Sequence, residues 1–203
     1  MTIPASRLAP REPTTTNTST RTAALVAGIS LALMAVLAPL GLMVALPAGL
    51  TGPAALAVLV VSALDVVIGV ALYPILKPGG ELIAGVAAAL RVAYAAAFAV
   101  AASFLLAPAD VERFQAIWDA ALFLFGLHLL AVGVAAVRAA GIPTWIGVLV
   151  LIAGAGYTVD AVSVALAPSA PLSLGQVAFV GEVVLLVWLI GWGGRARRAA
   201  AVR

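Results

Sequence analysis

The sequence of 203 residues contains no cysteine, a single histidine and a single lysine. The absence of cysteine excludes disulfides, thiolate metal sites and cysteine nucleophiles. His128 alone cannot build a hydrolytic zinc site, because such sites use two or three histidines. The lysine, Lys77, lies in a loop, which excludes a retinal-type Schiff base. Neither a Gly-x-Ser-x-Gly elbow nor a phosphate-binding loop is present, so the sequence predicts no cofactor and no metal site, and it argues against an enzyme.

Charged residues are also scarce, at 9% of the chain, while 65% of the residues are hydrophobic. Soluble domains contain about 25% charged and about 45–50% apolar residues. With a mean hydropathy of +1.21, the chain belongs in a lipid bilayer. The pI near 10.0 does not indicate a nucleic-acid partner, because a net charge of +3 comes from few, dispersed basic residues that flank apolar runs.

Six apolar runs are each long enough to cross the hydrocarbon core, which takes about 20 residues. They cover residues 23–46, 53–76, 82–107, 115–138, 143–166 and 174–192. The fold class that they predict is an all-α polytopic transmembrane bundle of six helices spanning 23–192. The polar stretch 1–22 is predicted to be a disordered N-terminal tail, and 193–203 a basic C-terminal tail.

The basic residues predict the orientation in the membrane. If the N-terminus is cytoplasmic, the external loops hold only Arg113, beside Asp110 and Glu112. The cytoplasmic segments then hold nine basic residues: Arg7, Arg11, Arg21, Lys77, Arg138, Arg195, Arg197, Arg198 and Arg203. By the positive-inside rule, both termini are cytoplasmic, and we expect a multi-pass protein of the bacterial plasma membrane.

Beyond the bilayer itself, the sequence indicates partners only faintly. The tail RARRAAAVR reads most simply as a stop-transfer flank, and the alternative is that it attracts anionic lipid. A homodimer is a further hypothesis, with the small residues Ala24, Gly28 and Ala32 as a candidate seam. Packing of this face within the chain is the simpler use.

Arg91 is the most costly residue of the predicted spans, since an arginine at a helix centre costs about 2.5–3.5 kcal/mol or more. Asp65, Arg91, His128 and Glu182 each lie about 10–11 residues from the cytoplasmic end of their runs, a shared depth of about 15–17 Å. Tyr94 shares a helix face with Arg91. These five residues form the candidate buried polar layer at the membrane midplane.

Asp119 and Asp160 lie higher, about 17–19 residues from the cytoplasmic side, and form a candidate outer pair. Asp119 and His128 are nine residues apart, which places them on opposite faces of a straight helix. Both can point inward only if their helix is central or bends at Gly126. Otherwise Asp119 lies at the outer rim in contact with water, which is the interpretation that we favour.

Four carboxyl groups share the predicted interior with one arginine. Arg91 is expected to keep one or two carboxylates ionised, Asp65 or Glu182 first, and the remaining acids are expected to be protonated. His128 is either a hydrogen-bonded core residue or a proton relay. The leading hypothesis is a proton- or small-solute-binding, transporter-like protein. The first alternative is a structural, sensory or accessory membrane protein whose polar layer only fixes helix packing, and the second is an intramembrane enzyme.

Several motifs along residues 23–192 resemble a known family. They are Asp65 with Ala71-Leu72-Tyr73, Leu90-Arg91-x-x-Tyr94, Phe125-Gly126-Leu127-His128-Leu129-Leu130, Gly141-Ile142-Pro143-x-x-Ile146-Gly147-Val148-Leu149, Gly154-x-Gly156-Tyr157-x-x-Asp160, Gly181-Glu182 and Trp188-Leu189. In this order they resemble the bacterial membrane family named domain of unknown function 4386. The resemblance implies a multi-pass membrane protein and no particular activity.

Overall fold

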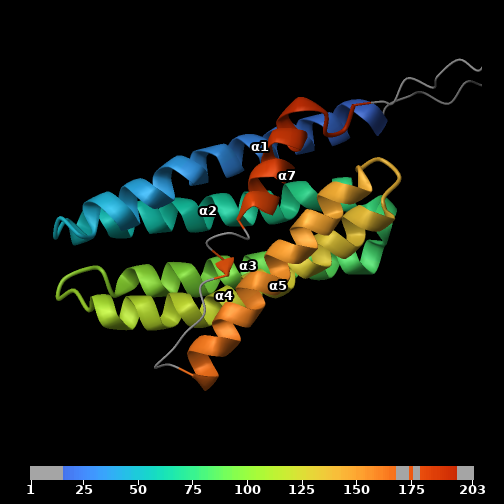
Figure 1. Cartoon of the computed structure of the whole chain (residues 1–203). Coiled ribbons are helices and arrows are strands. Elements are labelled where there is room, and N and C mark those ends of the chain that lie inside the picture. Colours follow the sequence, from blue (N-terminus) through green and yellow to red (C-terminus); the bar gives the residue numbers. More distant parts are fainter. Residues whose placement is uncertain (1–15, 168–173, 176–178, 196–203) are drawn as a thin grey trace, which may run out of the picture.

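A computed structural model describes residues 16–167, 174–175 and 179–195, and every regular element in these ranges is a helix (Figure 1). In chain order the elements are α1 (Thr16–Pro39), the π-helix η1 (Leu40–Ala45), α2 (Thr51–Leu76), the 3₁₀-helix η2 (Lys77–Gly79), α3 (Glu81–Ser103), α4 (Val111–Arg138), α5 (Thr144–Leu166) and α7 (Val180–Gly191). The predicted all-α fold is confirmed.

Five of these helices are long and apolar enough to cross a membrane, namely α1 to α5. The chain is therefore a multi-pass membrane protein. The sixth, α7, has twelve residues, which is about 18 Å of helix. It is shorter than the predicted run 174–192 and shorter than the hydrocarbon core, which is about 30 Å thick.

Several predicted boundaries differ from the structure, and α3, for example, ends at Ser103 rather than at residue 107. Helix α1 begins at Thr16, so the last seven residues of the predicted disordered tail are helical. One of them, Arg21, donates hydrogen bonds to backbone carbonyls of α7. Helix α4 begins at Val111 rather than at residue 115, because the Asp110 side chain accepts a hydrogen bond from the Arg113 N–H at 2.9 Å and caps the helix. The rest of the predicted tails, 1–15 and 196–203, lies outside the described residues.

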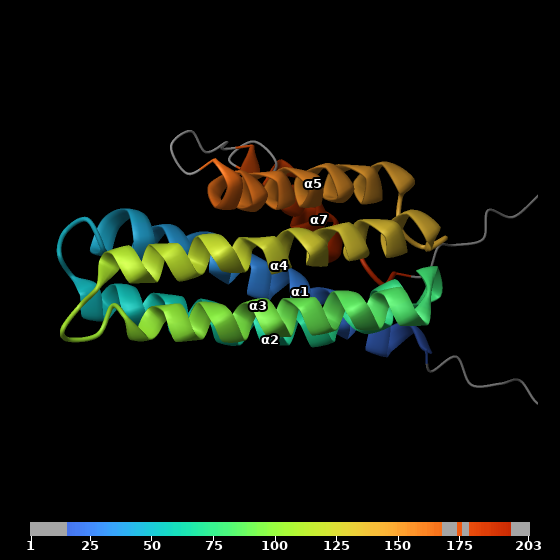
Figure 2. The same cartoon turned by 90° about the horizontal axis from the view of Figure 1, so that it is seen from below.

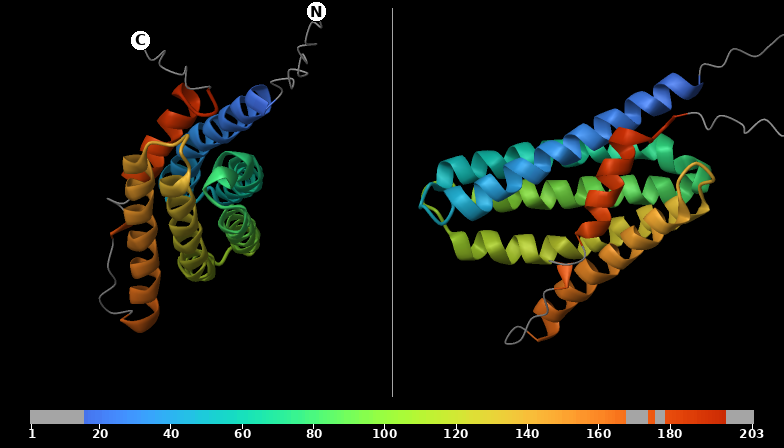
Figure 3. Two further views of the ribbon diagram at one scale, coloured as in Figure 1. Left: turned by 90° about the vertical axis from the view of Figure 1, so that its right-hand side faces the viewer. Right: turned by 45° about the horizontal axis from the view of Figure 1, so that its top comes forward.

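The helices form a closed ring of neighbours. Each helix from α1 to α5 packs against the next, and α7 packs against both α5 and α1, which closes the ring. Figure 3 looks along this arrangement from one end, and Figure 2 shows α2, α3 and α4 running nearly parallel to one another. Residues near the middle of several helices therefore face a common interior.

Glycines bring α4 and α5 into backbone contact. A Cβ atom added at Gly154 would lie 2.6 Å from the backbone nitrogen of Leu130, and one at Gly126 would lie 2.7 Å from that of Thr158. Such close approach is a common way for transmembrane helices to associate. It also draws Phe125 and His128, the neighbours of Gly126 in sequence, toward the interior.

Helix α7 is fastened to α1 at its C-terminal end. The Arg21 guanidinium donates hydrogen bonds to the carbonyl oxygens of Leu189 (3.1 Å), Ile190 (2.6 Å) and Gly193 (2.9 Å). These carbonyls have no partner further along the helix, and a cation there also complements the helix dipole. Gly28 packs against Ile190, so the small-residue face of α1 is used within the chain.

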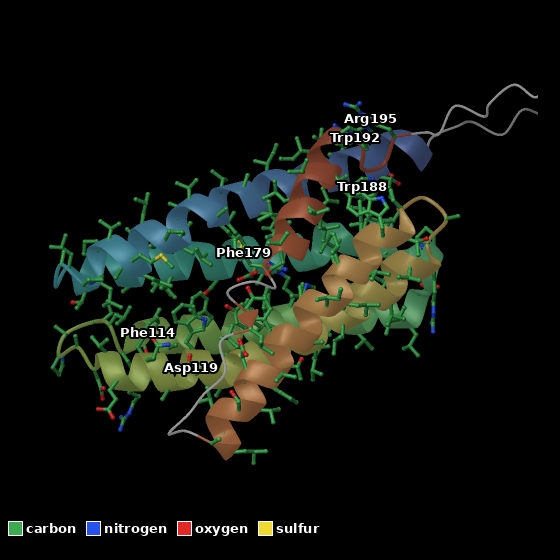
Figure 4. The ribbon with its side chains drawn as sticks, in the orientation of Figure 1. Phe114, Asp119, Phe179, Trp188, Trp192 and Arg195 are labelled. Atoms are coloured by element: carbon green, nitrogen blue, oxygen red, sulfur yellow. The ribbon has the colours of Figure 1, made fainter. Side chains whose placement is uncertain are left out.

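Basic residues gather at one end of the bundle. Lys77 follows α2, Arg138 ends α4, and Arg21 and Arg195 lie where α1 begins and α7 ends, all on the side of the α4–α5 loop (Figures 1 and 4). At the opposite end, Arg113 pairs with Asp110 at 3.7 Å. We call these the basic end and the acidic end.

Candidate functional site

Arg91 lies in the middle of α3 and is buried to 2% exposure. Its Nε donates to Oδ1 of Asp65 at 2.8 Å, and its Nη2 lies 2.6 Å from the same oxygen. Asp65, on α2, has no exposed surface. Gly69 lies one turn further along α2, and any Cβ there would meet the backbone of Ala88 and the stem of Arg91. The missing side chain lets α2 approach the arginine closely.

His128, on α4, takes a second face of the guanidinium. Its Nε2 is 3.1 Å from Nη1 of Arg91, and its Nδ1 is 2.7 Å from the carbonyl oxygen of Ala87. An arginine can only donate hydrogen bonds, so Nε2 must accept. The proton of the neutral ring is therefore assigned to Nδ1, which donates to Ala87. Both ring nitrogens are thus in use.

Two apolar side chains complete the surroundings of Arg91. The sulfur of Met34 on α1 is 4.0 Å from Nη2, and the guanidinium carbon lies 5.4 Å from the ring centre of Phe125 on α4. A cation over an aromatic ring is attracted to its face. Arg91 on α3 thus touches α1, α2 and α4.

An aromatic wall continues from the arginine toward the acidic end. The ring of Tyr94 stacks on Phe98 at 5.5 Å and lies 5.0 Å from Phe125. Phe98 in turn contacts Trp118 at 5.5 Å, and Phe125 meets Tyr157 edge-on at 5.1 Å. These rings cover the site with apolar surface on the side of α3, α4 and α5.

Two buried polar atoms in the described part of the chain have no hydrogen-bond partner, Oδ2 of Asp65 and Nε1 of Trp118. Both bonds from Arg91 fall on Oδ1, which leaves Oδ2 unpaired inside the bundle. An orphaned carboxylate oxygen is costly, about 1–3 kcal/mol or more for a charged group. It is the position at which a proton, a water molecule or a ligand donor would be stabilised.

Glu182 lies in the first turn of α7 and is half-buried. Its carboxyl group lies near the Tyr157 hydroxyl and is close enough to Arg91 and Asp65 to interact with their charges. Among the described residues, however, Arg91 forms its ion pair with Asp65 and not with Glu182. Glu182 is therefore a second carboxyl group on the edge of the cluster.

The outer aspartates are not joined to this cluster or to each other. Asp119 is half-buried and accepts a hydrogen bond from Gln115 at 2.9 Å. Asp160 accepts hydrogen bonds from the backbone N–H groups of Leu174 (2.8 Å) and Gly175 (2.5 Å). Asp160 thus holds the chain where it turns back after α5. Each of the two residues has a local hydrogen-bond partner, and their role as an outer pair stays a prediction.

Sequence reasoning placed Phe125 and Tyr157 in family motifs but not in the site, and it missed Met34. Phe125 precedes His128 by one helical turn and could have been found from that spacing, whereas nothing in the sequence around Met34 distinguishes it from a lipid-facing residue. No group of three or more acidic or histidine side chains within the described ranges could hold a metal ion.

Comparison with known proteins places the chain in a family. The family model described as domain of unknown function DUF4386 matches residues 48–113 and 111–193. The chain belongs to this family. The predicted resemblance is confirmed, and the DUF4386 match includes Asp65, Arg91, His128 and Glu182 but not Arg21 or Met34.

A similar protein is found in Archaeoglobus fulgidus. An uncharacterized protein of the archaeon Archaeoglobus fulgidus is 33% identical over 127 residues, which are 63% of this chain and 75% of the archaeal protein. No solved structure matches the chain. The family name assigns no activity, so the chemistry must be argued from the site.

Proposed function

We propose that this DUF4386 protein binds protons or a small solute at the Arg91 centre, as a secondary transporter does. The observation that carries the proposal is the unpaired Oδ2 of Asp65, which faces the interior of an apolar bundle beside a permanently charged guanidinium. Ionisable groups inside a membrane usually mark such sites.

The short helix α7 supports the same interpretation. It begins within the bundle and carries Glu182 in its first turn, and Figure 4 shows Phe179, just before it, near the middle of the molecule. Transporters often bind substrates and coupling ions at the ends of such half-length helices near the bilayer midplane.

The chemistry follows from one cation between two carboxyl groups. A proton on Asp65 would weaken its ion pair and free Arg91 to bind Glu182 or the anionic group of a solute. His128 is occupied on both nitrogens, so its role in this arrangement is to orient Arg91. The acids Asp65 and Glu182 are the proton-exchanging groups of the proposal.

For localisation, we propose the plasma membrane of a bacterial cell with the basic end in the cytoplasm. Arg21, Lys77, Arg138 and Arg195 lie at that end, and positive residues accumulate on the cytoplasmic side of membrane proteins. Both termini would then be cytoplasmic.

The test is reconstitution in liposomes that contain a pH-sensitive dye, with imposed gradients of protons and small anions. The double variant Arg91→Met/Asp65→Leu removes the charges together and is expected to fold, since replacing a whole buried pair is far milder than breaking it. Flux should fall to the level of empty liposomes. The matched control is Arg113→Gln/Asp110→Asn, which removes an exposed pair and should leave flux unchanged.

The structural alternative also has an observation in its favour, because Nε, Nη1 and Nη2 of Arg91 all have partners. If the cluster only locks the helices, the double variant keeps its fold and any biological phenotype. The single variant Arg91→Met is then expected to show only a lower free energy of unfolding, by about 3–5 kcal/mol, because it leaves Asp65 unpaired. Flux through the wild-type protein that a folded double variant lacks would support transport. No flux through the wild-type protein, or the same flux through a folded double variant, would count against a transport role of the Arg91 centre.

A further inference from the structure

A groove of about 710 Å³ lies between α5 and α7 at the basic end of the bundle. Three of the four tryptophans of the chain line it, Trp145 on α5 and Trp188 and Trp192 at the end of α7, together with valines of α7. Figure 4 shows Trp188, Trp192 and Arg195 gathered at this end, far from Asp119. The groove is separate from the Arg91 centre.

The groove opens toward the lipid. The side chains of Trp145 and Trp192 are 58% and 61% exposed, although both lie at the ends of membrane helices. Tryptophan is enriched at this level because its ring is apolar while its N–H can reach the headgroups. A molecule in the groove would therefore enter sideways from the membrane.

Arg195 is the single charged residue that lines the groove. No carboxylate among the described residues forms an ion pair with it, in contrast to Arg91, Lys77 and Arg113. The remaining lining is almost entirely hydrocarbon and indole. The matching ligand has an anionic head and an apolar chain, and a guanidinium suits a phosphate especially well because it can donate two parallel hydrogen bonds.

We propose that this groove binds one anionic phospholipid of the leaflet at the basic end, with its phosphate on Arg195 and an acyl chain along the valines of α7. The volume falls within the range of ligand pockets, about 300–1,000 Å³. A membrane-spanning helix about 10 Å across and about 30 Å long would need more than about 2,000 Å³. A zwitterionic phospholipid carries the same phosphate, but its own cationic headgroup opposes the attraction to Arg195, so a lipid with a net negative charge fits better.

The groove tryptophans provide the measurement. The full chain is reconstituted in phosphatidylcholine vesicles that contain a small, fixed fraction of brominated phosphatidylglycerol or brominated phosphatidylcholine, and quenching of tryptophan fluorescence is compared. Trp118 lies in the aromatic wall and adds the same background to each sample. Quenching by the anionic lipid should be stronger, and Arg195→Gln should reduce this preference by about fivefold, the effect of one basic residue near a charged surface.

The control removes charge from the tail but not from the groove. Arg197→Gln/Arg198→Gln should keep the preference for the anionic lipid, because these residues follow Arg195 in sequence but do not line the groove. Val184→Phe, which narrows the groove, should reduce quenching by both lipids.

Loss of the preference in the tail variant but not in Arg195→Gln would overturn the proposal. Equal quenching by both lipids would assign the groove to a neutral amphiphile, and quenching by neither would leave a protein partner as its occupant.

Discussion

Arg91 is tolerated in the membrane because partners on two neighbouring helices, α2 and α4, stabilise its charge. A lone arginine at a helix centre costs about 2.5–3.5 kcal/mol or more. Here Asp65 neutralises it, His128 accepts from one amino group, and Phe125 presents its ring to the guanidinium. Apart from Oδ2 of Asp65, the polar side-chain atoms of Asp65, Arg91 and His128 all have partners. The one side-chain atom of this cluster that lacks a hydrogen-bond partner thus belongs to Asp65.

The hydrogen bonds of His128 lead to a prediction at the residue scale. Because Nε2 accepts from Arg91 and Nδ1 donates to Ala87, the ring should be neutral and protonated on Nδ1. The chain has one histidine, so ¹⁵N spectra of histidine-labelled protein in lipid give one set of ring signals. We expect a protonated Nδ1 and an unprotonated Nε2. In Arg91→Met/Asp65→Leu this constraint is gone, and a mixture of tautomers should appear. Protonation at Nε2 in the wild-type protein would contradict the assignment.

Depth counting along the sequence brings Asp65, Arg91 and His128 to one level, and the structure places all three in contact. Counting cannot show which carboxylate pairs with the arginine, because rotation of the helices decides between Asp65 and Glu182. It also cannot find Met34, since an apolar residue that touches a charge looks like any other apolar residue. Asp160 resembles a site residue in the sequence but holds a chain reversal, which only the fold reveals.

At the scale of elements, the bundle depends on helices that approach one another at glycine. Gly126 on α4 and Gly154 on α5 each face the backbone of the other helix, so that any side chain there would collide with atoms that cannot turn away. Gly85 on α3 has open space where its side chain would be. These positions allow a matched comparison of the same residue type in two environments.

We expect Gly154→Val to separate α4 from α5 and to displace His128 from Arg91. Overpacking of a buried position typically costs about 1–3 kcal/mol and sometimes more. The control Gly85→Ala should be neutral or stabilising by up to about 1 kcal/mol, because alanine has the higher helix propensity. Thermal unfolding in detergent, followed by circular dichroism, measures both. Equal unfolding temperatures for Gly154→Val and the wild-type protein would show that the close packing of α4 and α5 does not limit stability.

At the scale of the whole molecule, the two proposed sites lie in different parts of the ring of helices. The Arg91 centre lies in the interior, whereas the proposed lipid groove lies outside, between α5 and α7 at the basic end. The same end carries most of the basic residues of the described chain. The orientation of the bundle in the membrane therefore decides which leaflet the groove faces.

Orientation can be measured because the chain has no cysteine of its own. Single cysteines are introduced at two exposed loop positions, Ala48→Cys between α1 and α2 and Ala140→Cys between α4 and α5. A membrane-impermeant maleimide applied to intact cells should label position 48 and should reach position 140 only after the cells are lysed. The reverse pattern would place the basic end outside.

The number of helices and the order of the apolar runs follow from hydropathy alone. The length of α7 does not, because the run 174–192 is apolar apart from Gln176 and Glu182 and contains no proline to end a helix. The position of this part of the chain is set by contacts with residues that are distant in sequence. Asp160 binds the backbone at Leu174 and Gly175, and Gly181 packs against Leu149 of α5. Such tertiary contacts leave no periodic signal in a sequence.

The hydrogen bonds between Arg21 and the end of α7 have a consequence for the synthesis of the protein. Arg21 and Leu189 are separated by 168 residues, which at about 5–20 residues per second is about ten to thirty seconds of synthesis. Throughout this time α1 has been synthesised, but the carbonyl groups at the end of α7 that accept hydrogen bonds from Arg21 do not yet exist. The seam between the first and last helices is therefore the final joint of the ring to close. A nascent chain that stops before α7 has an open ring, in which Arg21 and the Gly28 face are uncovered. Such exposed groups are what membrane quality control would recognise.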